Sequence, residues 1–522
     1  MLKTYKDIED FLYNLQYSPA KASDFNLDLS NYDRPLPFKI YRNRESIDLD
    51  DNFPICINDL DGIDYSNFEI ISYLLWYTYG FTSYNWLTKP TLNGQNTSLS
   101  FFRRSVASGG GLYPGEIYLY VESIKGIKSG LYYFDVRGPR LILLREGNFQ
   151  EFIKKSLQYN QDRNVYIFIT SFYWKNFFKY LNFSYRLQGL DIGAIVSQAH
   201  LISKKLGLNS EIRYHFDDKK INDFLGINAE EESSYVVLPI DMDNNSYKSE
   251  NKVPAFEYFK NDTTFNYIEH LNVGPKNVCQ DIYKINSNII NSGLIKVKKN
   301  EIASFKEEAN VVHKEKYDYD ILKASVSRIS PGENFLSDFL NIQHVHKVLD
   351  VGMQEQFKND IFSDNYSVLK DVEIYFYANK IEGLPKGYYY YNPSNKSFVL
   401  KHKGDFSSVF QENLTRKNFN LVEMPLIVHL VLNMKKFIEN MKFRGYRVMQ
   451  MEAGRIMHQI QLNAAGLNLG SHPMLGYRAD NLEEFFGIQN NITVQMSIGK
   501  YRPLLRLTNN LLNKTKGEQF YV

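Results

Sequence analysis

The chain has 522 residues, more than one hydrophobic core usually serves, so we expect two or more domains. With 61 Lys and Arg against 59 Asp and Glu, the net charge of +2 argues against a nucleic-acid-binding or membrane-surface protein. Two cysteines without a CxxC spacing exclude a disulfide framework, and the absence of a long apolar run or signal peptide predicts a cytoplasmic protein.

The stretch FFRRSVASGGGLYPGEI, residues 101–117, combines cations, a hydroxyl and glycines directly before an expected strand. Glycines allow a backbone to approach a flat ring, and their N–H groups can bond its polar edge. Ser108 can donate a further hydrogen bond, and Arg103 and Arg104 can pair with phosphate or ribityl oxygens. Alternatively, this is a flexible turn with solvated arginines, which the stretch by itself favours.

The next elements alternate between strands and one long helix, which predicts an α+β fold. EIYLYVES (116–123) has the alternation of a strand, and GLYYFDVRGPRLILL (130–144) predicts a hairpin that turns at residues 137–139. LDIGAIVSQAHLISKKLGL (190–208) repeats apolar residues at helical spacing, with Asp191 near the expected start of the helix.

The same order of patterns returns in the second half of the chain. GIKSGLYYF (126–134) matches GLPKGYYYY (383–391) at an offset of 257, and SYRLQGLDIGAIVSQ (184–198) matches GYRVMQMEAGRIMHQ (445–459) at an offset of 261. A polar segment at 241–254 lies between the copies. We therefore expect domains at 1–245 and 321–522, joined by a linker and irregular segment over residues 246–320.

In the second copy, EIYFYANK (373–380) predicts a strand, and residues 392–395 predict a hairpin turn. A second apolar helix is expected over 452–470, with His472 at its end as either a helix cap or a contact for a bound ring. Lys500 and Arg502 would share one face if IGKYRP is a strand. His344 and His346 lack a third ligand at metal spacing, so no metal site is predicted.

These motifs together resemble the nitroreductase-like FMN flavoproteins and, more narrowly, the azoline dehydrogenases of the SagB type. The resemblance rests on LLWYTYGFT (74–82), RRSVASGGGLYPGEIYLYV (103–121), GIKSGLYYFD (126–135) and KYLNFSYR (179–186). It implies two nitroreductase-like domains that form a pseudo-dimer within one chain. It also implies FMN as cofactor, held between a phosphate-binding side and a Ser-Gly side that come from opposite subunits.

The two copies keep complementary parts of such a site. The first copy keeps SGGGLYP and a Lys-Tyr pair, where the second copy has NYSVLKD (365–371) and Asn440-Met441. The second copy keeps SVSR (325–328), NLGSH (468–472) and IGKYRPLLR (498–506), which resemble the phosphate-binding stretches of the family. The resemblance thus implies one FMN site per chain, made by Arg103, Arg104, Ser108, Gly109, Gly110, Leu112, Tyr113, Ser325, Ser327, Arg328, Leu469, Gly470, Ser471, Lys500 and Arg502.

Lys179 and Tyr180 are the catalytic candidates that the resemblance indicates, because aromatising an azoline requires a base for one proton. On the residues alone, an ordinary surface lysine beside a half-buried tyrosine is the favoured interpretation. The expected function is oxidation of thiazolines or oxazolines in a ribosomally made, modified precursor peptide. A separate leader-peptide-recognition or cyclodehydratase protein is the expected partner. A flavin-poor scaffold subunit and a general NAD(P)H-dependent nitro- or quinone reductase are the alternatives.

Overall fold

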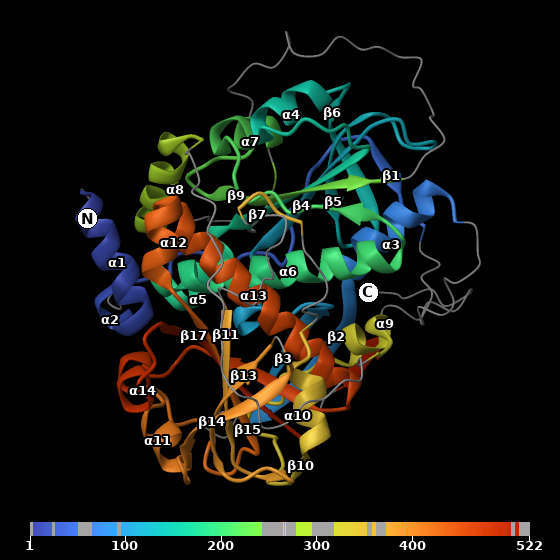
Figure 1. Ribbon diagram of the computed structural model, residues 1–522. Helices are drawn as coiled ribbons and strands as arrows, with labels where there is room; N and C mark the ends of the chain where they lie inside the picture. The colour runs from blue at the N-terminus through green and yellow to red at the C-terminus, as the bar shows by residue number, and fades with distance from the viewer. Residues whose placement is uncertain are drawn as a thin grey trace.

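The protein folds into two α+β domains, seen one above the other in Figure 1. A computed structural model describes residues 4–22, 27–50, 65–90, 96–242, 265, 267, 278–294, 318–351, 358–361, 372–393, 395–502 and 507–510. Most of the expected linker at 241–254, and the counterpart of the Ser-Gly loop at 365–371, lie outside these residues.

The first domain is built on a seven-stranded antiparallel sheet with the strand order β1-β6-β5-β4-β7-β9-β8. Its central strands are buried on both faces, which explains their continuous runs of Ile, Val, Phe and Tyr. The hairpin expected around residues 137–139 joins β5 to β6. The bounds are β1 Ser46–Asp48, β4 Gly115–Val121, β5 Gly130–Asp135, β6 Arg140–Glu146, β7 Val165–Phe172, β8 Asn209–Ser210 and β9 Glu232–Asp241.

The second domain repeats this sheet strand for strand. Its order is β14-β13-β11-β15-β17-β16, which is the order of the first sheet without β1. The predicted hairpin around residues 392–395 joins β13 to β14. The bounds are β11 Val372–Ala378, β13 Gly387–Asn392, β14 Ser397–Lys403, β15 Leu426–Leu432, β16 Gly470–Met474 and β17 Asn491–Gly499; β10 Leu340–Asn341 and β12 Ile381–Glu382 form a separate parallel pair.

Two long buried helices, α6 Ser184–Lys205 and α13 Phe443–Gly466, cross between the sheets (Figure 1). Both begin earlier than the sequence patterns predicted, so Asp191 lies inside α6 and not near its start. The remaining helices are α1 Tyr5–Tyr17, α2 Pro19–Ala22, α3 Asn67–Tyr79, α4 Gln150–Leu157, α5 Tyr173–Tyr180, α7 Asp218–Leu225, α8 Gln280–Ser292, α9 Ile321–Ser327, α10 Ile342–Leu349, α11 Ser407–Glu412, α12 Met434–Met441 and α14 Ala479–Phe486. Helix α8 falls within residues 246–320, where an irregular segment was expected.

The crossing of α6 and α13 has an approximate twofold symmetry. A methyl group on Gly193 would overlap the carbonyl of Met451, and one on Gly454 would overlap the carbonyl of Leu190. These two contacts exchange under the offset of 261 that relates the copies in the sequence. The glycines therefore set how closely the helices approach, and the chain has the architecture of a dimer within one polypeptide.

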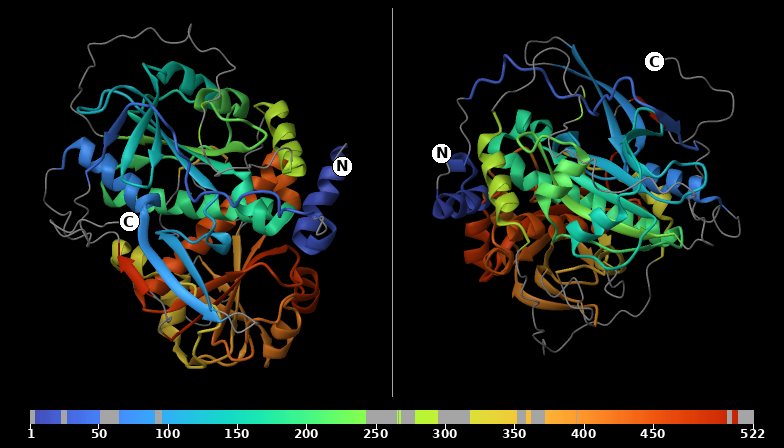
Figure 2. Two further views of the ribbon diagram at one scale, coloured as in Figure 1. Left: turned by 180° about the vertical axis from the view of Figure 1, so that it is seen from behind. Right: turned by 90° about the horizontal axis from the view of Figure 1, so that it is seen from above.

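Both ends of the chain cross to the opposite domain. Helix α1 packs near α14, and Gln16 Nε2 donates to the Ile492 carbonyl at 2.8 Å. Strand β18 (Leu507–Asn510) follows the second domain in the sequence, yet pairs with β2 (Phe81–Pro90), which in turn pairs with β3 (Asn96–Arg104). Figure 2 shows β2 and β3 as a long arm beside the second domain. This arm leads directly into the glycine-rich loop.

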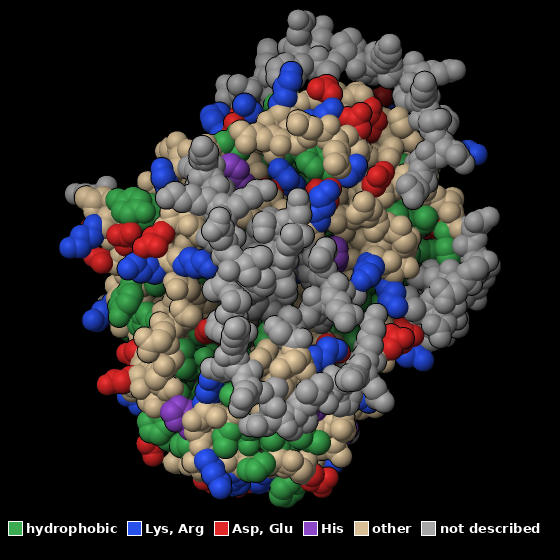
Figure 3. All heavy atoms as spheres, in the orientation of Figure 1, with side chains coloured by type: hydrophobic (Ala, Val, Ile, Leu, Met, Phe, Trp, Pro, Cys, Tyr) green, Lys and Arg blue, Asp and Glu red, His purple; other side chains and the backbone are tan. Residues whose placement is uncertain are grey.

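Charged side chains of both signs intersperse over the face shown in Figure 3, as the small net charge suggests. Across the domain boundary lies a buried charge cluster, in which Asp218 of α7 ion-pairs with Arg444 and Arg447 of α13. Among the helices that the structure describes, none has the length and apolar character needed to cross a bilayer.

Candidate functional site

The glycine-rich loop begins where β3 ends and returns the chain into β4. Gly109–Gly111 form a 3₁₀ turn in which Gly110 and Gly111 have φ of +66° and +70°. Only glycine adopts these angles without steric cost, so the backbone of the turn requires glycine at positions 110 and 111. We call residues 105–113 the Ser-Gly loop.

The carboxylate of Asp191, in α6, anchors this loop by hydrogen bonds. It accepts from Ser108 Oγ at 2.6 Å, from the Gly109 N–H at 3.0 Å and from Asn176 Nδ2 at 3.4 Å. Ser108 Oγ in turn accepts from the Tyr113 N–H at 2.8 Å. The single hydroxyl proton of Ser108 is thus directed to Asp191, which corrects the expectation that Ser108 donates to a ligand.

The Lys-Tyr pair lies next to Gly110 of the same loop. A methyl group placed on Gly110 would lie 2.6 Å from Tyr180 Oη and 2.9 Å from Lys179 Nζ. Both side chains come from the last turn of α5. The two motifs, about 70 residues apart in the sequence, therefore form one site, and Gly110 is the point where they meet.

The two side chains of this pair are tuned in opposite directions. Desolvation, followed by the charges of Arg416 and Arg34, lowers the pKa of Lys179. Desolvation and the neighbouring Asp191 carboxylate raise the pKa of Tyr180 to about 12. Tyr180 is therefore a neutral hydrogen-bond donor near neutral pH, while Lys179 is the member of the pair that is shifted toward acting as a base.

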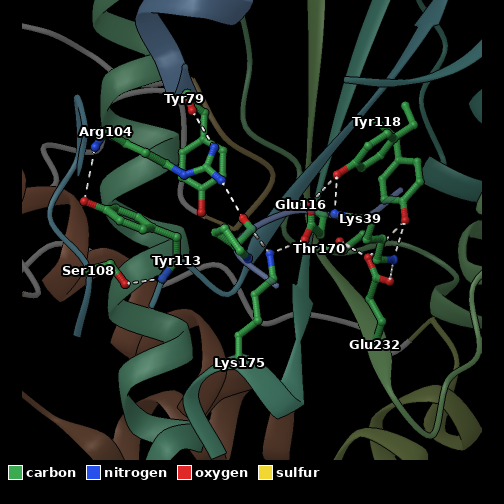
Figure 4. A network of polar contacts seen from close by, with 12 residues as sticks. Lys39, Tyr79, Arg104, Ser108, Tyr113, Glu116, Tyr118, Thr170, Lys175 and Glu232 are labelled. Atoms are coloured by element: carbon green, nitrogen blue, oxygen red, sulfur yellow. Dashed lines mark hydrogen bonds and ion pairs between the residues drawn. The ribbon is translucent and has the colours of Figure 1, made fainter. Parts of the chain in front are cut away.

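A buried polar network supports the loop from within the first domain (Figure 4). The Arg104 N–H donates to Tyr113 Oη at 3.1 Å, and the Arg104 guanidinium donates to the carbonyls of Tyr79 and Pro37 at 2.7 and 3.0 Å. Arg104 is 1% exposed, so its guanidinium braces the loop; this corrects its assignment to phosphate. Deeper in the domain, buried ion pairs join Lys175 to Glu116 and Lys39 to Glu232.

The second domain meets the Ser-Gly loop through Arg328, at the end of α9. The Arg328 Nε–H donates to the Ser105 carbonyl at 3.4 Å, and the guanidinium of Arg103 donates to the Arg328 carbonyl. Arg103 is thus tied to the boundary between the domains. Arg328, the one cation of the SVSR motif, thus lies next to the beginning of the loop.

Strand β16 adds two polar side chains to the second-domain side of the boundary. Ser471 Oγ and His472 Nδ1 are both buried without a hydrogen-bond partner among the described residues. Burial lowers the pKa of His472 to about 4, so the ring is neutral at neutral pH. His472 packs on Phe419 with ring centroids 4.5 Å apart. It lies in a strand after α13 has ended, so it is not the helix cap that was considered from the sequence.

A cavity of about 280 Å³ opens beside Phe419, and Arg502 lies on its wall. Sequence reasoning placed Lys500 and Arg502 on one face of a strand, but β17 ends at Gly499. Lys500 Nζ turns to Asp338 at 2.7 Å, and Arg502 lines the cavity instead. Arg502 stays a predicted phosphate ligand, on a cavity wall to which Glu333 and Glu423 also contribute.

Other predicted ligands serve packing. Ser325 Oγ donates to the Ile321 carbonyl within α9 at 2.7 Å and accepts from Gln198 of α6. Ser327 Oγ donates to the Ala324 carbonyl at 3.4 Å. The remaining predicted ligands are Leu112 in the Ser-Gly loop, Leu469 directly before β16, and Gly470 as the first residue of β16.

Sequence reasoning missed two contributors to this site. Asp191 was read as a helix-start signal, although a buried acid seven residues inside a helix is itself a sign of a specific partner. Arg416 follows α11 in the second domain and acts on Lys179 and Tyr180 electrostatically. It has no distinctive local motif, and only the fold brings it to the pair.

The residues present fit a phosphorylated, flat cofactor such as FMN. The Ser-Gly loop provides glycine backbone that a ring can approach, and Arg328 and Arg502 remain the predicted cations for a phosphate. Ser471 Oγ and His472 Nδ1 are buried polar atoms that still need partners, which the polar edge of such a ligand supplies. These groups come from both domains.

The chain is similar to known proteins at two levels, a family sequence pattern and a solved fold. Residues 366–500 match the model of the nitroreductase family, so the match falls in the second half of the chain. No curated protein matches the chain. A chain of the microcin synthetase complex McbBCD from E. coli is similar with a TM-score of 0.28 at 18% identity, over 43% of this chain and 75% of that chain.

A solved structure assigned to the nitroreductases, from Anabaena variabilis, covers the whole architecture. It is similar with a TM-score of 0.72 at 19% identity, over 95% of this chain and 99% of that chain. Both halves are therefore included in the likeness. The chain thus has the fold of two tandem nitroreductase-like α+β domains, and its second domain carries the sequence pattern of the nitroreductase family.

Proposed function

We propose that this protein is an FMN-dependent azoline dehydrogenase, which oxidises thiazoline or oxazoline rings of a modified, ribosomally made peptide to thiazoles or oxazoles. The observation that carries the proposal is the meeting of Lys179 and Tyr180 with Gly110 of the Ser-Gly loop. The motifs that resemble azoline dehydrogenases in the sequence are thereby joined in one place. A separate protein that recognises the leader peptide remains the expected partner.

Aromatising the ring removes a proton from one ring carbon and a hydride from its neighbour. FMN, when bound, accepts the hydride. Lys179 takes the proton on Nζ, because desolvation and the nearby cations favour its neutral form. Tyr180 keeps its own proton and donates a hydrogen bond that orients the ring, since its pKa of about 12 prevents it from acting as the base.

The test compares Lys179→Ala and Tyr180→Phe with Asn440→Ala, the counterpart of Lys179 in α12. The assay is the loss of two hydrogens per ring from a thiazoline-bearing peptide, measured by mass spectrometry, with dioxygen as oxidant. We expect both variants of the pair to remain folded and yellow and to be slowed about 100-fold or more, the usual effect of losing a positioned acid–base group. Asn440→Ala should retain the wild-type rate.

Three results would oppose this assignment. Full activity of the flavin-loaded pair variants would remove Lys179 and Tyr180 from the reaction. A colourless wild-type protein that binds no added FMN would support the scaffold alternative. Rapid turnover of NAD(P)H with a quinone or nitroarene, without azoline oxidation, would support the general reductase.

A further inference from the structure

Asp191 is a buried carboxylate that no cation among the described residues neutralises. It is 4% exposed, and its partners among these residues are hydrogen-bond donors and not ion-pair partners. Its three hydrogen-bond donors, Ser108, Gly109 and Asn176, are all neutral groups. Burying a carboxylate costs folding free energy, so another interaction must offset that cost. Here the carboxylate fixes the conformation of the Ser-Gly loop through its bonds to Ser108 and Gly109.

The other half of the molecule provides an internal comparison. Glu452 occupies the equivalent position of α13, at the offset of 261. Its carboxylate accepts from Arg455 at 3.0 Å and from the hydroxyl of Tyr214, a residue of the first domain. An acid at this helix position can thus be neutralised by an arginine one turn away. The counterpart of Arg455 beside Asp191 is Ala194, and two of the three donors to Asp191, Ser108 and Gly109, belong to the loop.

We propose that Asp191 is a positioning residue that holds the Ser-Gly loop in its ligand-binding conformation, and that protonation of its carboxyl releases the loop. The proposal rests on the proposed function only where it names FMN as the ligand. The conformation of the loop can be followed by hydrogen exchange of residues 105–113, which needs no ligand.

Protonation of the Asp191 carboxyl changes which hydrogen bonds it can make with the groups around it. As a carboxylate, Asp191 accepts from all three donors; once protonated, it carries a hydrogen where the donors point. Asn176 Oδ1 is buried without a partner among the described residues, and a half-turn of the amide, which now presents Nδ2 to Asp191, brings this acceptor to the new hydrogen. This change competes with the bonds to Ser108 and Gly109 on the loop.

Asp191 is also the group around the loop whose charge changes near neutral pH. Desolvation raises its pKa to about 7, against the lowering effect of the bonds from Ser108, Gly109 and Asn176. The titratable groups that face it are Tyr79 of α3 and Tyr180 of α5, and burial raises the pKa of both tyrosines. Both phenols therefore remain neutral between pH 6 and 8, roughly the window in which Asp191 changes charge.

The test measures FMN affinity by quenching of flavin fluorescence from about pH 6 to 8.5, together with hydrogen exchange of residues 105–113 without FMN. Exchange rates are corrected for their intrinsic pH dependence. For the wild type, we expect FMN affinity to fall up to about tenfold per pH unit below pH 7, with faster exchange in the loop. Riboflavin should show the same trend, which separates Asp191 from titration of the FMN phosphate.

Asp191→Asn should bind FMN at least about tenfold more weakly at pH 8, without the pH dependence, because a hydrogen bond to a charged group is lost. Ser108→Ala removes one donor and should weaken binding less. Glu452→Gln is the matched control and should keep the wild-type pH profile. An unchanged pH profile and loop exchange in Asp191→Asn would overturn the proposal. If the wild type binds no FMN, the proposed function fails, and the exchange data still decide the role of Asp191.

Discussion

Gly110 and Gly111 offer a sharp test of the site, because they differ in surroundings but not in backbone. Both have positive φ, so alanine strains the loop equally at either position. A methyl group on Gly111 meets no atom within 4 Å, whereas one on Gly110 meets Tyr180 Oη and Lys179 Nζ at 2.6 and 2.9 Å. Gly111→Ala is therefore a control for the backbone effect of Gly110→Ala.

The magnitude follows from these distances. A left-handed alanine costs about 1–2 kcal/mol, and this cost is common to both variants. Comfortable packing needs about 3.5 Å between atoms, so in Gly110→Ala the Tyr180 hydroxyl must move by about 1 Å. A displacement of about 1 Å in a reacting site can lower the rate about 100-fold. We expect equal losses of stability, and a rate loss of that size only for Gly110→Ala.

The assay combines thermal unfolding with azoline oxidation on matched flavin-loaded samples. Similar melting temperatures with about 100-fold different turnover would place the Lys-Tyr pair over Gly110. If the two variants lose activity equally, the effect comes from the backbone alone. The pair would then lie away from the reacting ring, and the assignment of Lys179 and Tyr180 would be refuted.

Three further predictions concern the phosphate side, the stoichiometry and the domain boundary. Arg328→Ala and Arg502→Ala should each lower FMN retention about tenfold or more, measured as flavin per folded chain, through loss of charge-assisted bonds. Gentle purification should give one FMN per chain; two would contradict the complementary loss of motifs. Asp218→Asn should lower the free energy of unfolding by about 3–5 kcal/mol, because it leaves the buried Arg444 and Arg447 without their carboxylate. Although burial opposes it, the two arginines lower the pKa of Asp218, so this stability is present above pH 4 and is lost in stronger acid.

The sequence predicts the sheets and the repeat well, because these depend on local alternation and on spacing. β4 with the β5–β6 hairpin, and β11 with the β13–β14 hairpin, lie where the patterns indicate. The helix starts were placed late, since Asp191 resembles a capping residue when only its neighbours in the sequence are considered. Its true partners lie 82 and 83 residues away, and no periodicity reports contacts at that separation.

The sequence is equally unable to show which of the candidate cations binds a phosphate. Arg103, Arg104, Lys500 and Arg502 are indistinguishable in the sequence as phosphate ligands. The fold separates them: Arg104 is bonded to carbonyls of its own domain, Arg103 to the Arg328 carbonyl, and Lys500 to Asp338. Arg502 alone among the four lines the cavity. Charge identifies candidates, but the available hydrogen-bond partners determine which cation remains free for a ligand.

The two halves also show how one chain can use the same helix position for different purposes. In α6 the acid turns to the Ser-Gly loop, and in α13 it turns to Arg455 and to Tyr214 across the boundary. An acid engaged in this way cannot hold a loop, and the second copy has no glycine run at 365–371 for it to hold. A separate homodimer must build both of its sites from one sequence. A fused dimer is free of that constraint, so one half can keep the loop while the corresponding position in the other stabilises the boundary between the domains.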